Sequence, residues 1–461
     1  MNYEESVHAL LALGRELGAS RHANTQKFGL ENITILAQSL GNPERAAPCV
    51  HIAGTNGKGS TAAMLESILR AAGLRTGLCT SPHLERINER IRINGQPVSD
   101  DDFAAAWTRV HDAIEPLLAA GKLAAHPTFF ECVTAMAFSS FAAHSMDFGI
   151  YEVGMGGRLD ATNIVEPQVA VIASIDFDHE DYLGHSIEQI AAEKAGIIKR
   201  DADVVSAVER PEARAVIARR CEEMGARLVE VDSAWLLEEP QSAGGYYRAV
   251  AAPPDSTESL VLAPSLPGRF QLRNALAAAT AARVLAGRGF RIGDEAIAYG
   301  IATTRWPGRL ERLAARPAVY LDGAHNPQAA RELVKFWDEN FAGRRILLVY
   351  GAVRDKAVDE IAGLLFPRAS AVILTEPRQP RAISAARLAE LTAHHTRDAI
   401  VVRDPAAALE RALEMAAPDD AVFITGSLFL VGDLRSYWAS HSTSQAASAT
   451  PGGRVADAPQ R

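Results

Sequence analysis

A glycine-rich stretch near the start of the chain has the residue types that bind phosphate. The sequence HIAGTNGKGSTAAML, residues 51–65, places three glycines around Lys58. Glycines leave backbone N–H groups open to a phosphate, and a lysine here can reach the outer phosphates of a nucleotide. The spacing departs from the common G-x-x-x-x-G-K-[ST] loop, because two residues separate Gly54 from Gly57 and Gly59 follows the lysine. The alternative is a glycine-rich surface turn.

The elements expected around this stretch favour phosphate binding over a plain turn. Residues 47–54, APCVHIAG, predict a short strand. Residues 60–73, STAAMLESILRAAG, predict a helix with Leu65, Ile68 and Leu69 on one face. A phosphate loop needs this order of strand, turn and helix, because the helix N-terminus adds partial positive charge.

Three further polar residues could do chemistry: a glutamate, a histidine and a lysine. Glu152 ends the strand-like run DFGIYEVG, and His179 lies in DFDHED, which follows another such run. An isolated histidine is more often a hydrogen-bonded core residue than a ligand. Lys194 has only isoleucine and alanine one helical turn away on either side, so no helical ion pair is available to it. The simple surface interpretation of Lys194 is therefore weakened.

Short runs rich in Val and Ile alternate with Ala-rich stretches of helical period, a pattern typical of α/β folds with parallel sheets. At 461 residues the chain suits at least two domains. We expect a P-loop-type N-terminal domain with a mainly parallel sheet over residues 1–302 and a smaller doubly wound, Rossmann-like C-terminal α/β domain over residues 303–440. Residues 441–461 have little apolar content and are expected to form a disordered tail.

The boundary between the two domains is expected in TTRWPGRLERL, where a proline and a glycine suit a connection. Beyond it the sequence has five strand-like runs separated by helical segments. The runs are PAVYLDGA, RRILLVYGA, SAVILTEP, AIVVRD and DAVFITGS. Residues 238–259, rich in Gly, Ser and Pro, predict an excursion from the first domain, such as a hairpin, and their role stays open.

The composition argues against several classes of partner. The net charge is −9, and no basic tract could neutralise a run of phosphates, so nucleic acid is not expected as a partner. No apolar run reaches the ~18 residues of a membrane span, and the N-terminus lacks a basic signal region. The four cysteines are widely spaced and suggest free thiols. We expect a cytoplasmic monomer that does not bind membranes.

Several motifs, in order along most of the chain, resemble the folylpolyglutamate synthase and dihydrofolate synthase family of the Mur ligase superfamily. The motifs are GTNGKGS, TSPHLERINERIRING, PTFFE, YEVGMGGRLDATN, SIDFDHEDYLG, EKAGI, LPGRFQLRNA, WPGRLE and LDGAHNP. The glycine after the lysine and the long YEVGMGGRLDATN match are the most specific. One departure is Phe270, where the family often has a histidine.

The resemblance implies a role for each matching residue. The implied nucleotide-binding residues are Gly54, Thr55, Asn56, Gly57, Lys58, Gly59, Ser60, Asn274, Arg309 and Asp322. The implied metal ligands are Ser81, Glu152, His179 and Lys194. The implied catalytic residues are Lys58, Glu152, His179, Lys194 and His325. The implied pterin-binding residues are Gln26, Lys27, Phe28, Thr128, Phe129, Phe130, Leu159, Asp160 and Ala161. For Phe129 and Phe130 taken singly, core packing is the more common role.

The resemblance also implies the reaction. ATP would phosphorylate a carboxylate to an acyl phosphate, and the amino group of L-glutamate would attack it. The acceptors would be dihydropteroate and the glutamate tail of reduced folates. Two Mg²⁺ ions would assist, one of them through a carbamate on Lys194. Phosphoryl transfer of this kind depends on positioning and charge neutralisation, so the C-terminal domain is expected to close over the P-loop domain with Asp322 on the ribose side.

Three alternatives remain open from the sequence. The chain could have only one of the two activities. It could be a Mur-type peptidoglycan ligase, although Gly59, TFFE and GGRLDATN argue against this. It could also be a regulatory nucleotide switch, because residues 181–184, DYLG, match D-x-x-G, but the sequence has no N-K-x-D motif that would read guanine.

Overall fold

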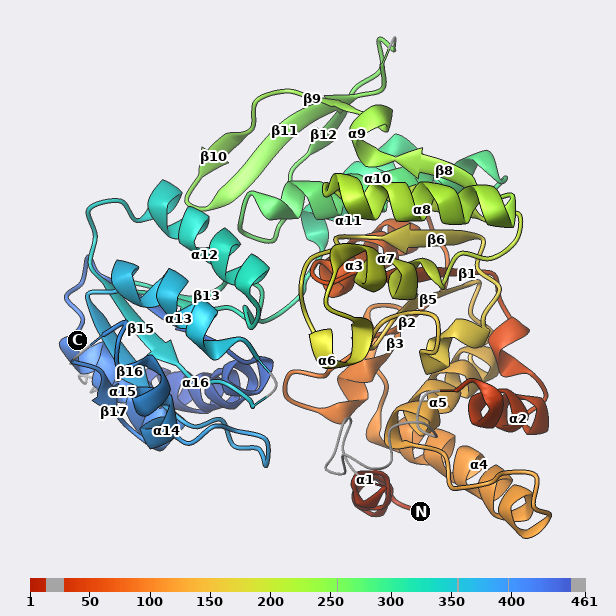
Figure 1. Cartoon of the computed structure of the whole chain (residues 1–461), viewed down its shortest axis with the longest axis horizontal. Coiled ribbons are helices and arrows are strands. Elements are labelled where there is room, and N and C mark those ends of the chain that lie inside the picture. The colour runs from red at the N-terminus through yellow and green to blue at the C-terminus, as the bar shows by residue number, and fades with distance from the viewer. Residues whose placement is uncertain (14–28, 255, 355, 397, 449–461) are drawn as a thin grey trace, which may run out of the picture.

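The computed structural model describes residues 1–13, 29–254, 256–354, 356–396 and 398–448. Figure 1 shows two α/β lobes side by side, with a small antiparallel sheet above the junction between them. Gln26, Lys27 and Phe28, predicted to contact a pterin, lie outside the described residues. No helix among the described residues is long and apolar enough to cross a membrane.

The N-terminal lobe is built on an eight-stranded sheet in the order β4-β3-β2-β5-β1-β6-β7-β8. The strands are β1 (Cys49–Ala53), β2 (Thr76–Cys79), β3 (Ile91–Ile93), β4 (Gln96–Pro97), β5 (Phe148–Glu152), β6 (Val169–Ile172), β7 (Asp203–Ser206) and β8 (Arg227–Glu230). The strands from β2 to β8 along this order are parallel, and β3 and β4 are antiparallel. The mainly parallel sheet expected from the sequence is confirmed.

Helices cover both faces of this sheet. They are α1 (Tyr3–Ala12), α2 (Glu31–Ser39), α3 (Lys58–Ala71), α4 (Asp100–Ala119), α5 (Phe129–Ala143), α6 (Glu180–Leu183), α7 (Ile187–Ala195), α8 (Pro211–Met224), α9 (Val231–Ala234), α10 (Phe270–Gly287) and α11 (Asp294–Thr303). Val50 and Ile150 point into a core formed with α3, α10 and α11, whereas Cys49 and Tyr151 on the same strands point into a core with α4 and α5. This alternation is the period-two pattern of strands buried on both faces.

Residues 236–262 form the small antiparallel sheet, in agreement with the predicted excursion. Its strands are β9 (Leu236–Leu237), β10 (Gln241–Ala243), β11 (Tyr246–Ala252) and β12 (Leu260–Leu262). β10 and β11 form a hairpin whose turn contains Gly244 and Gly245, both with positive φ. Tyr247 on β11 donates a hydrogen bond to Glu339 of the C-terminal lobe, so this sheet touches both lobes.

The C-terminal lobe has a six-stranded sheet in the order β13-β14-β18-β15-β16-β17. Its strands are β13 (Glu311–Ala315), β14 (Ala318–Leu321), β15 (Ile346–Tyr350), β16 (Ala371–Leu374), β17 (Ile400–Val401) and β18 (Ala421–Thr425). Its helices are α12 (Pro327–Asn340), α13 (Val358–Leu365), α14 (Ala385–Thr392), α15 (Pro405–Met415) and α16 (Leu428–Ser448). The 3₁₀ helices of the chain are η1 (Pro43–Arg45), η2 (Ile87–Arg90), η3 (Ala161–Ile164) and η4 (Phe366–Arg368). All five predicted runs are parallel strands, which confirms the doubly wound fold.

Two expectations for the C-terminal lobe differ from the structure. β13 is an antiparallel edge strand that begins within the segment expected to be only a connection. A half-exposed edge strand has no continuous apolar run, so the sequence pattern does not predict it. The tail was expected to be disordered from residue 441, but α16 continues to Ser448. A helix that is already nucleated adds further residues at little cost.

Candidate active site

A cavity of about 610 Å³ lies between the two lobes. It is lined by every residue that the sequence assigned to nucleotide binding, metal binding or catalysis. These residues are Gly54, Thr55, Asn56, Gly57, Lys58, Gly59, Ser60, Ser81, Glu152, His179, Lys194, Asn274, Arg309, Asp322 and His325. The residues from Gly54 to Arg309 precede the C-terminal sheet, whereas Asp322 and His325 follow its strand β14. The structure therefore brings together residues 271 positions apart in the chain, from Gly54 to His325.

The glycine loop joins β1 to α3 and opens toward this cavity. Gly57 is the N-cap of α3, has a φ of +82° and makes no side-chain cap. A left-handed conformation here suits glycine alone, and a Cβ at this position would collide with Oδ1 of Asn274 on α10. Because no side chain caps the first turn of α3, its N–H groups are available to an anion.

The side chain of Lys58 folds back onto the glycine loop and hydrogen-bonds to its backbone. Its Nζ donates hydrogen bonds to the carbonyl oxygens of Gly54 at 2.8 Å and Thr55 at 3.0 Å. Burial lowers the pKa of Lys58, while the carboxylates of Glu152 and Asp178 act in the opposite direction. The ammonium group is thus held by weak neutral acceptors, which a phosphate could replace with a stronger, charged one.

Glu152, at the end of β5, has the environment of a metal ligand. It is buried, accepts a hydrogen bond from the backbone N–H of Ser81 at 3.1 Å, and makes no ion pair with any described residue. Burial raises the pKa of this carboxyl group. A buried carboxylate without an ion pair, in a cavity that Ser81 and His179 also line, fits a hard divalent cation, because the ion would supply the missing charge.

Lys194 points inward from α7. It is 4 % exposed, and its Nζ donates a hydrogen bond to the carbonyl oxygen of Gly54 at 3.0 Å. Burial, with Lys58 nearby, lowers the pKa of Lys194 to about 7. A large share of the side chain is therefore a neutral amine at neutral pH.

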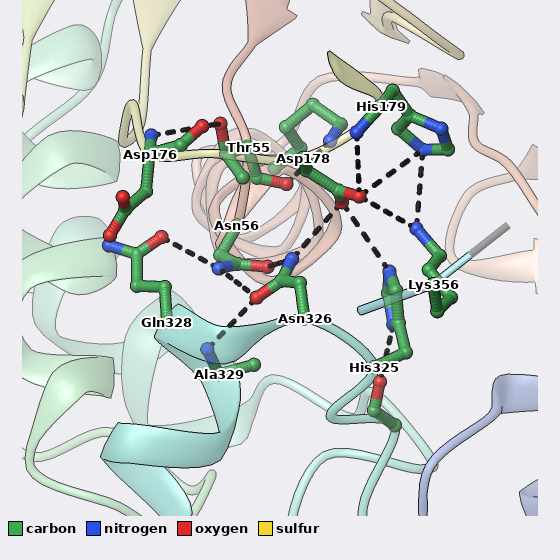
Figure 2. A network of polar contacts seen from close by, with 12 residues as sticks. Thr55, Asn56, Asp176, Asp178, His179, His325, Asn326, Gln328, Ala329 and Lys356 are labelled. Atoms are coloured by element: carbon green, nitrogen blue, oxygen red, sulfur yellow. Dashed lines mark hydrogen bonds and ion pairs between the residues drawn. The ribbon is translucent and has the colours of Figure 1, made fainter. Parts of the chain in front are cut away.

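Asp178 is the centre of a polar network between the two lobes, shown in Figure 2. Its carboxylate forms an ion pair with Lys356 at 2.8 Å and accepts a hydrogen bond from Nδ2 of Asn326 at 3.1 Å. Nε2 of His325 lies 3.9 Å from the same carboxylate. Burial by itself would raise the pKa of Asp178, but the positive charge of Lys356 is the largest opposing influence, and the pKa lies well below its usual value.

The glycine loop also contacts the C-terminal lobe directly (Figure 2). Asn56 and Asn326 exchange two amide hydrogen bonds, of 3.1 and 2.9 Å, and Asn56 donates another to Gln328 at 2.7 Å. Asn326 is the N-cap of α12, where its Oδ1 accepts from the backbone N–H of Ala329. The start of α12 is thus fixed against the loop that would hold phosphate.

Asp322, at the end of β14, is held by the backbone around it. Its carboxylate accepts hydrogen bonds from the N–H groups of Leu310 and Ala324, both at 2.9 Å. Burial raises its pKa, and Arg309 nearby opposes that change. His325 donates through Nδ1 to the carbonyl oxygen of Gly323 at 2.7 Å, and burial lowers its pKa to about 3. His325 is therefore neutral, with Nε2 as an acceptor facing the cavity.

Six of the predicted pterin residues fall among the described residues, and none of these six lines this cavity. Thr128 and Glu131 form a capping box at the start of α5, and Phe129 is buried in the core. The ring of Phe130 lies against Gly154, whose Cβ position would be 2.6 Å from it. Asp160 accepts hydrogen bonds from the N–H of Met155, at 3.0 Å, and from Thr162. Leu159 and Ala161 flank this aspartate.

The sequence analysis did not assign three residues that the network contains. Asp178 precedes His179 and Asn326 follows His325, so both lay next to predicted residues. Lys356 follows strand β15, at the carboxyl end of a parallel strand. Sites of open α/β sheets lie at such ends, and that rule was the signal that could have pointed to Lys356.

Comparison with known proteins matches the two lobes separately. The Mur ligase middle domain matches residues 52–282, and the Mur ligase glutamate ligase domain matches residues 308–428. The chain is 38 % identical over 416 residues to the dihydrofolate synthase/folylpolyglutamate synthase of Bacillus subtilis, which covers 89 % of this chain and 94 % of that protein.

Solved structures agree with this match. The structure of Escherichia coli FolC in complex with DHPP and ADP superposes with a TM-score of 0.84 at 31 % identity, covering 96 % of this chain and 99 % of that one. The Yersinia pestis bifunctional folylpolyglutamate synthase/dihydrofolate synthase complexed with AMPPNP and Mn ion superposes with a TM-score of 0.80 at 32 % identity, covering 96 % and 98 %. Fold, site and similarity agree, and the chain belongs to the dihydrofolate synthase/folylpolyglutamate synthase family of Mur-type ATP-dependent ligases.

Proposed function

We propose that this enzyme uses ATP to join L-glutamate to dihydropteroate and to the glutamate tail of reduced folates, through an acyl-phosphate intermediate. The observation that carries the proposal is the 610 Å³ interlobe cavity, which gathers the nucleotide loop, the acidic group Glu152 and the C-terminal residues Asp322 and His325. The names of its relatives, and the DHPP and ADP held by the E. coli structure, support the same substrates.

Activation of the carboxylate would depend on the glycine loop. The N–H groups of α3 and the ammonium of Lys58 bind the outer phosphates, and Lys58 exchanges its two carbonyl acceptors for phosphate oxygens. Arg309 and Asn274 hold the rest of the nucleotide, with Asp322 on the ribose side. Neutral His325 offers an acceptor, Nε2, at the place where the C-terminal lobe meets the reacting groups.

Two Mg²⁺ ions would be held by this chain's own residues. Ser81, Glu152 and His179 provide the first set of ligands, and a carbamate on Lys194 provides the ligand for the second ion. Bound Mg²⁺ supplies charge neutralisation to the phosphates. The Mn ion in the Y. pestis structure supports a divalent cation in relatives. The neutral amine of Lys194 supports the carbamate, since only that form reacts with CO₂.

The acceptor would bind beside β5. Thr128, Phe129, Phe130, Leu159, Asp160 and Ala161 would form one side of the pocket, and the family resemblance adds Gln26, Lys27 and Phe28 to the residues that contact the pterin. Aromatic rings suit a flat pterin. We also propose that the enzyme works as a monomer on small-molecule substrates, because one chain supplies both walls of the cavity.

The test is phosphate release from ATP with Mg²⁺ and L-glutamate, with dihydropteroate in one reaction and tetrahydrofolate in another, and products identified by mass. Turnover with both acceptors is expected, and turnover with one assigns a single activity. A third reaction with a nucleotide-sugar peptide tests the peptidoglycan alternative. Phosphate release that is independent of glutamate would instead support a nucleotide switch. The variant Lys58→Ala is the control for contaminating ATPase.

A further inference from the structure

Lys356 is a buried cation that the C-terminal lobe places beside His179, one of the predicted metal ligands of the N-terminal lobe. Its side chain is 7 % exposed and its partner Asp178 is 11 % exposed. Its Nζ lies 2.8 Å from Oδ1 of Asp178 and 3.4 Å from Nε2 of His179 (Figure 2). Burying an ammonium group is costly unless it is paired, and Asp178 provides the pairing.

The contact with His179 identifies which ring nitrogen has the lone pair. An ammonium group has donors and no acceptor, so Nε2 of His179 must accept in this contact. A divalent ion binds neutral histidine through the same kind of lone pair. Lys356 and a metal ion at Nε2 would therefore require the same position, and their charges repel each other.

We propose that Lys356 is a tethered substitute for the metal: its ammonium occupies the cation position at His179 and Asp178 in the metal-free enzyme, and a divalent ion must displace it to bind there. Displacement breaks the ion pair that joins the segment after β15 to the segment after β6, so metal loading and the contact between the lobes are coupled. The freed ammonium becomes available to an anionic substrate in the cavity. This inference deepens the proposed function, because it concerns the metal that the proposed reaction uses.

The competing explanation is that Lys356 is only one of several ion pairs that hold the lobes together. Arg331 on α12 forms an ion pair of this kind with Asp176 of the N-terminal lobe, at 3.2 Å. It also forms one with Glu360 of its own lobe, at 3.2 Å. Like Lys356, it carries one positive charge across to a buried aspartate of the N-terminal lobe. No contact of Arg331 with His179 is present among the described residues, which makes it a matched control for loss of an interlobe cation.

The experiment measures Mn²⁺ binding to the full chain by electron paramagnetic resonance, without nucleotide, folate or glutamate. Asp359, His394 and His395 form a surface group that could also take a cation, so all proteins carry His394→Asn. The variants are Lys356→Met, Lys356→Arg and Arg331→Met. Thermal unfolding confirms that each is folded.

Lys356→Met is expected to bind Mn²⁺ about tenfold more tightly than the parent, because a unit charge beside a divalent ion is removed. Lys356→Arg and Arg331→Met are expected to match the parent. Equal or weaker binding by Lys356→Met, or equal gains in Lys356→Met and Arg331→Met, would overturn the proposal. Because no substrate is present, failure of the proposed ligase reaction would leave this result unchanged.

A second measurement does not depend on a variant. Brief acetylation followed by peptide mass spectrometry reports how accessible each lysine is, and exposed Lys122 serves as the internal reference. Mn²⁺ is expected to raise labelling of Lys356 several-fold relative to Lys122. Unchanged labelling at saturating Mn²⁺ would contradict displacement.

Discussion

The side chain of Lys194 donates a hydrogen bond to the carbonyl oxygen of Gly54, 140 positions away, at 3.0 Å. The contact ties helix α7 to the first glycine of the phosphate loop. Lys58 donates to the same carbonyl oxygen at 2.8 Å, so two lysines share one acceptor. Their mutual repulsion and burial favour a neutral Lys194, which is the form that can attack CO₂ and release a proton as the carbamate forms.

The first prediction concerns the pH dependence of Lys194. Its pKa is about 7 in the folded chain, against a usual value of 10.5. Between these values the unfolded chain binds more protons than the folded chain, so the free energy of unfolding should rise with pH across this window. Below about pH 7 Lys194 is protonated in both the folded and the unfolded chain, so the full cost of burying its charge is subtracted from the free energy of unfolding. Lys194→Met should remove this rise, measured by denaturant unfolding in CO₂-free buffer.

Carbamate formation should follow the same titration. With ¹³C-labelled bicarbonate, a carbamate resonance should grow as the pH rises through about 7, and it should be absent in Lys194→Met. Lys199, which donates to the carbonyl oxygen of Asn163 at 2.8 Å, provides the matched control variant Lys199→Met. A resonance that survives in Lys194→Met would assign the carbamate elsewhere.

Glu152→Gln should separate activity from stability. The buried carboxylate has no ion pair among the described residues, and burial raises its pKa. Its ionised form therefore destabilises the metal-free fold at neutral pH, and this cost grows as pH rises above the usual carboxyl range. The amide removes that charge, so the melting temperature should rise slightly while ligase turnover falls by at least about a hundredfold. A variant that melts lower and keeps activity would contradict the metal-ligand role.

Gly57→Ala tests the close approach of the phosphate loop to α10. Gly57 and Gly73 have similar φ values, +82° and +87°, but only Gly57 has Asn274 against its Cβ position. Positive φ should cost each alanine variant about 1–2 kcal/mol. Gly57→Ala should also lose the stabilisation that ADP gives, whereas Gly73→Ala should keep it. Differential scanning fluorimetry with and without ADP measures both effects.

Phe129 and Phe130 should respond differently to substitution. Phe129 is 4 % exposed in the core, so Phe129→Ala should lower the free energy of unfolding by about 3–5 kcal/mol. Phe130 is only partly buried and lies against Gly154. Phe130→Leu should change stability little and raise KM for dihydropteroate about tenfold, the size of a lost aromatic stacking contact. An unchanged KM would place Phe130 outside the pterin pocket.

Much of the fold was predictable because local patterns are strong where strands are buried on both faces. The runs around Val50, Ile150 and Val171 are mainly apolar, and each became a central parallel strand. Helix boundaries were less accurate. The helix after the glycine loop begins at Lys58 rather than residue 60. Termini depend on contacts from other elements, which local sequence does not contain.

By itself the sequence determined the family, the two α/β domains and the residue types of the site, because these follow from short motifs with fixed order. The roles assigned to those residues, the boundary at 302/303 and the pterin pocket stay predictions. Only the tertiary structure decided that Lys194 shares an acceptor with Lys58, and that Asp178 meets Lys356, 178 positions away. Such pairings arise where two sheets place their carboxyl ends against one cavity, and no local pattern encodes the distance between residues on separate lobes.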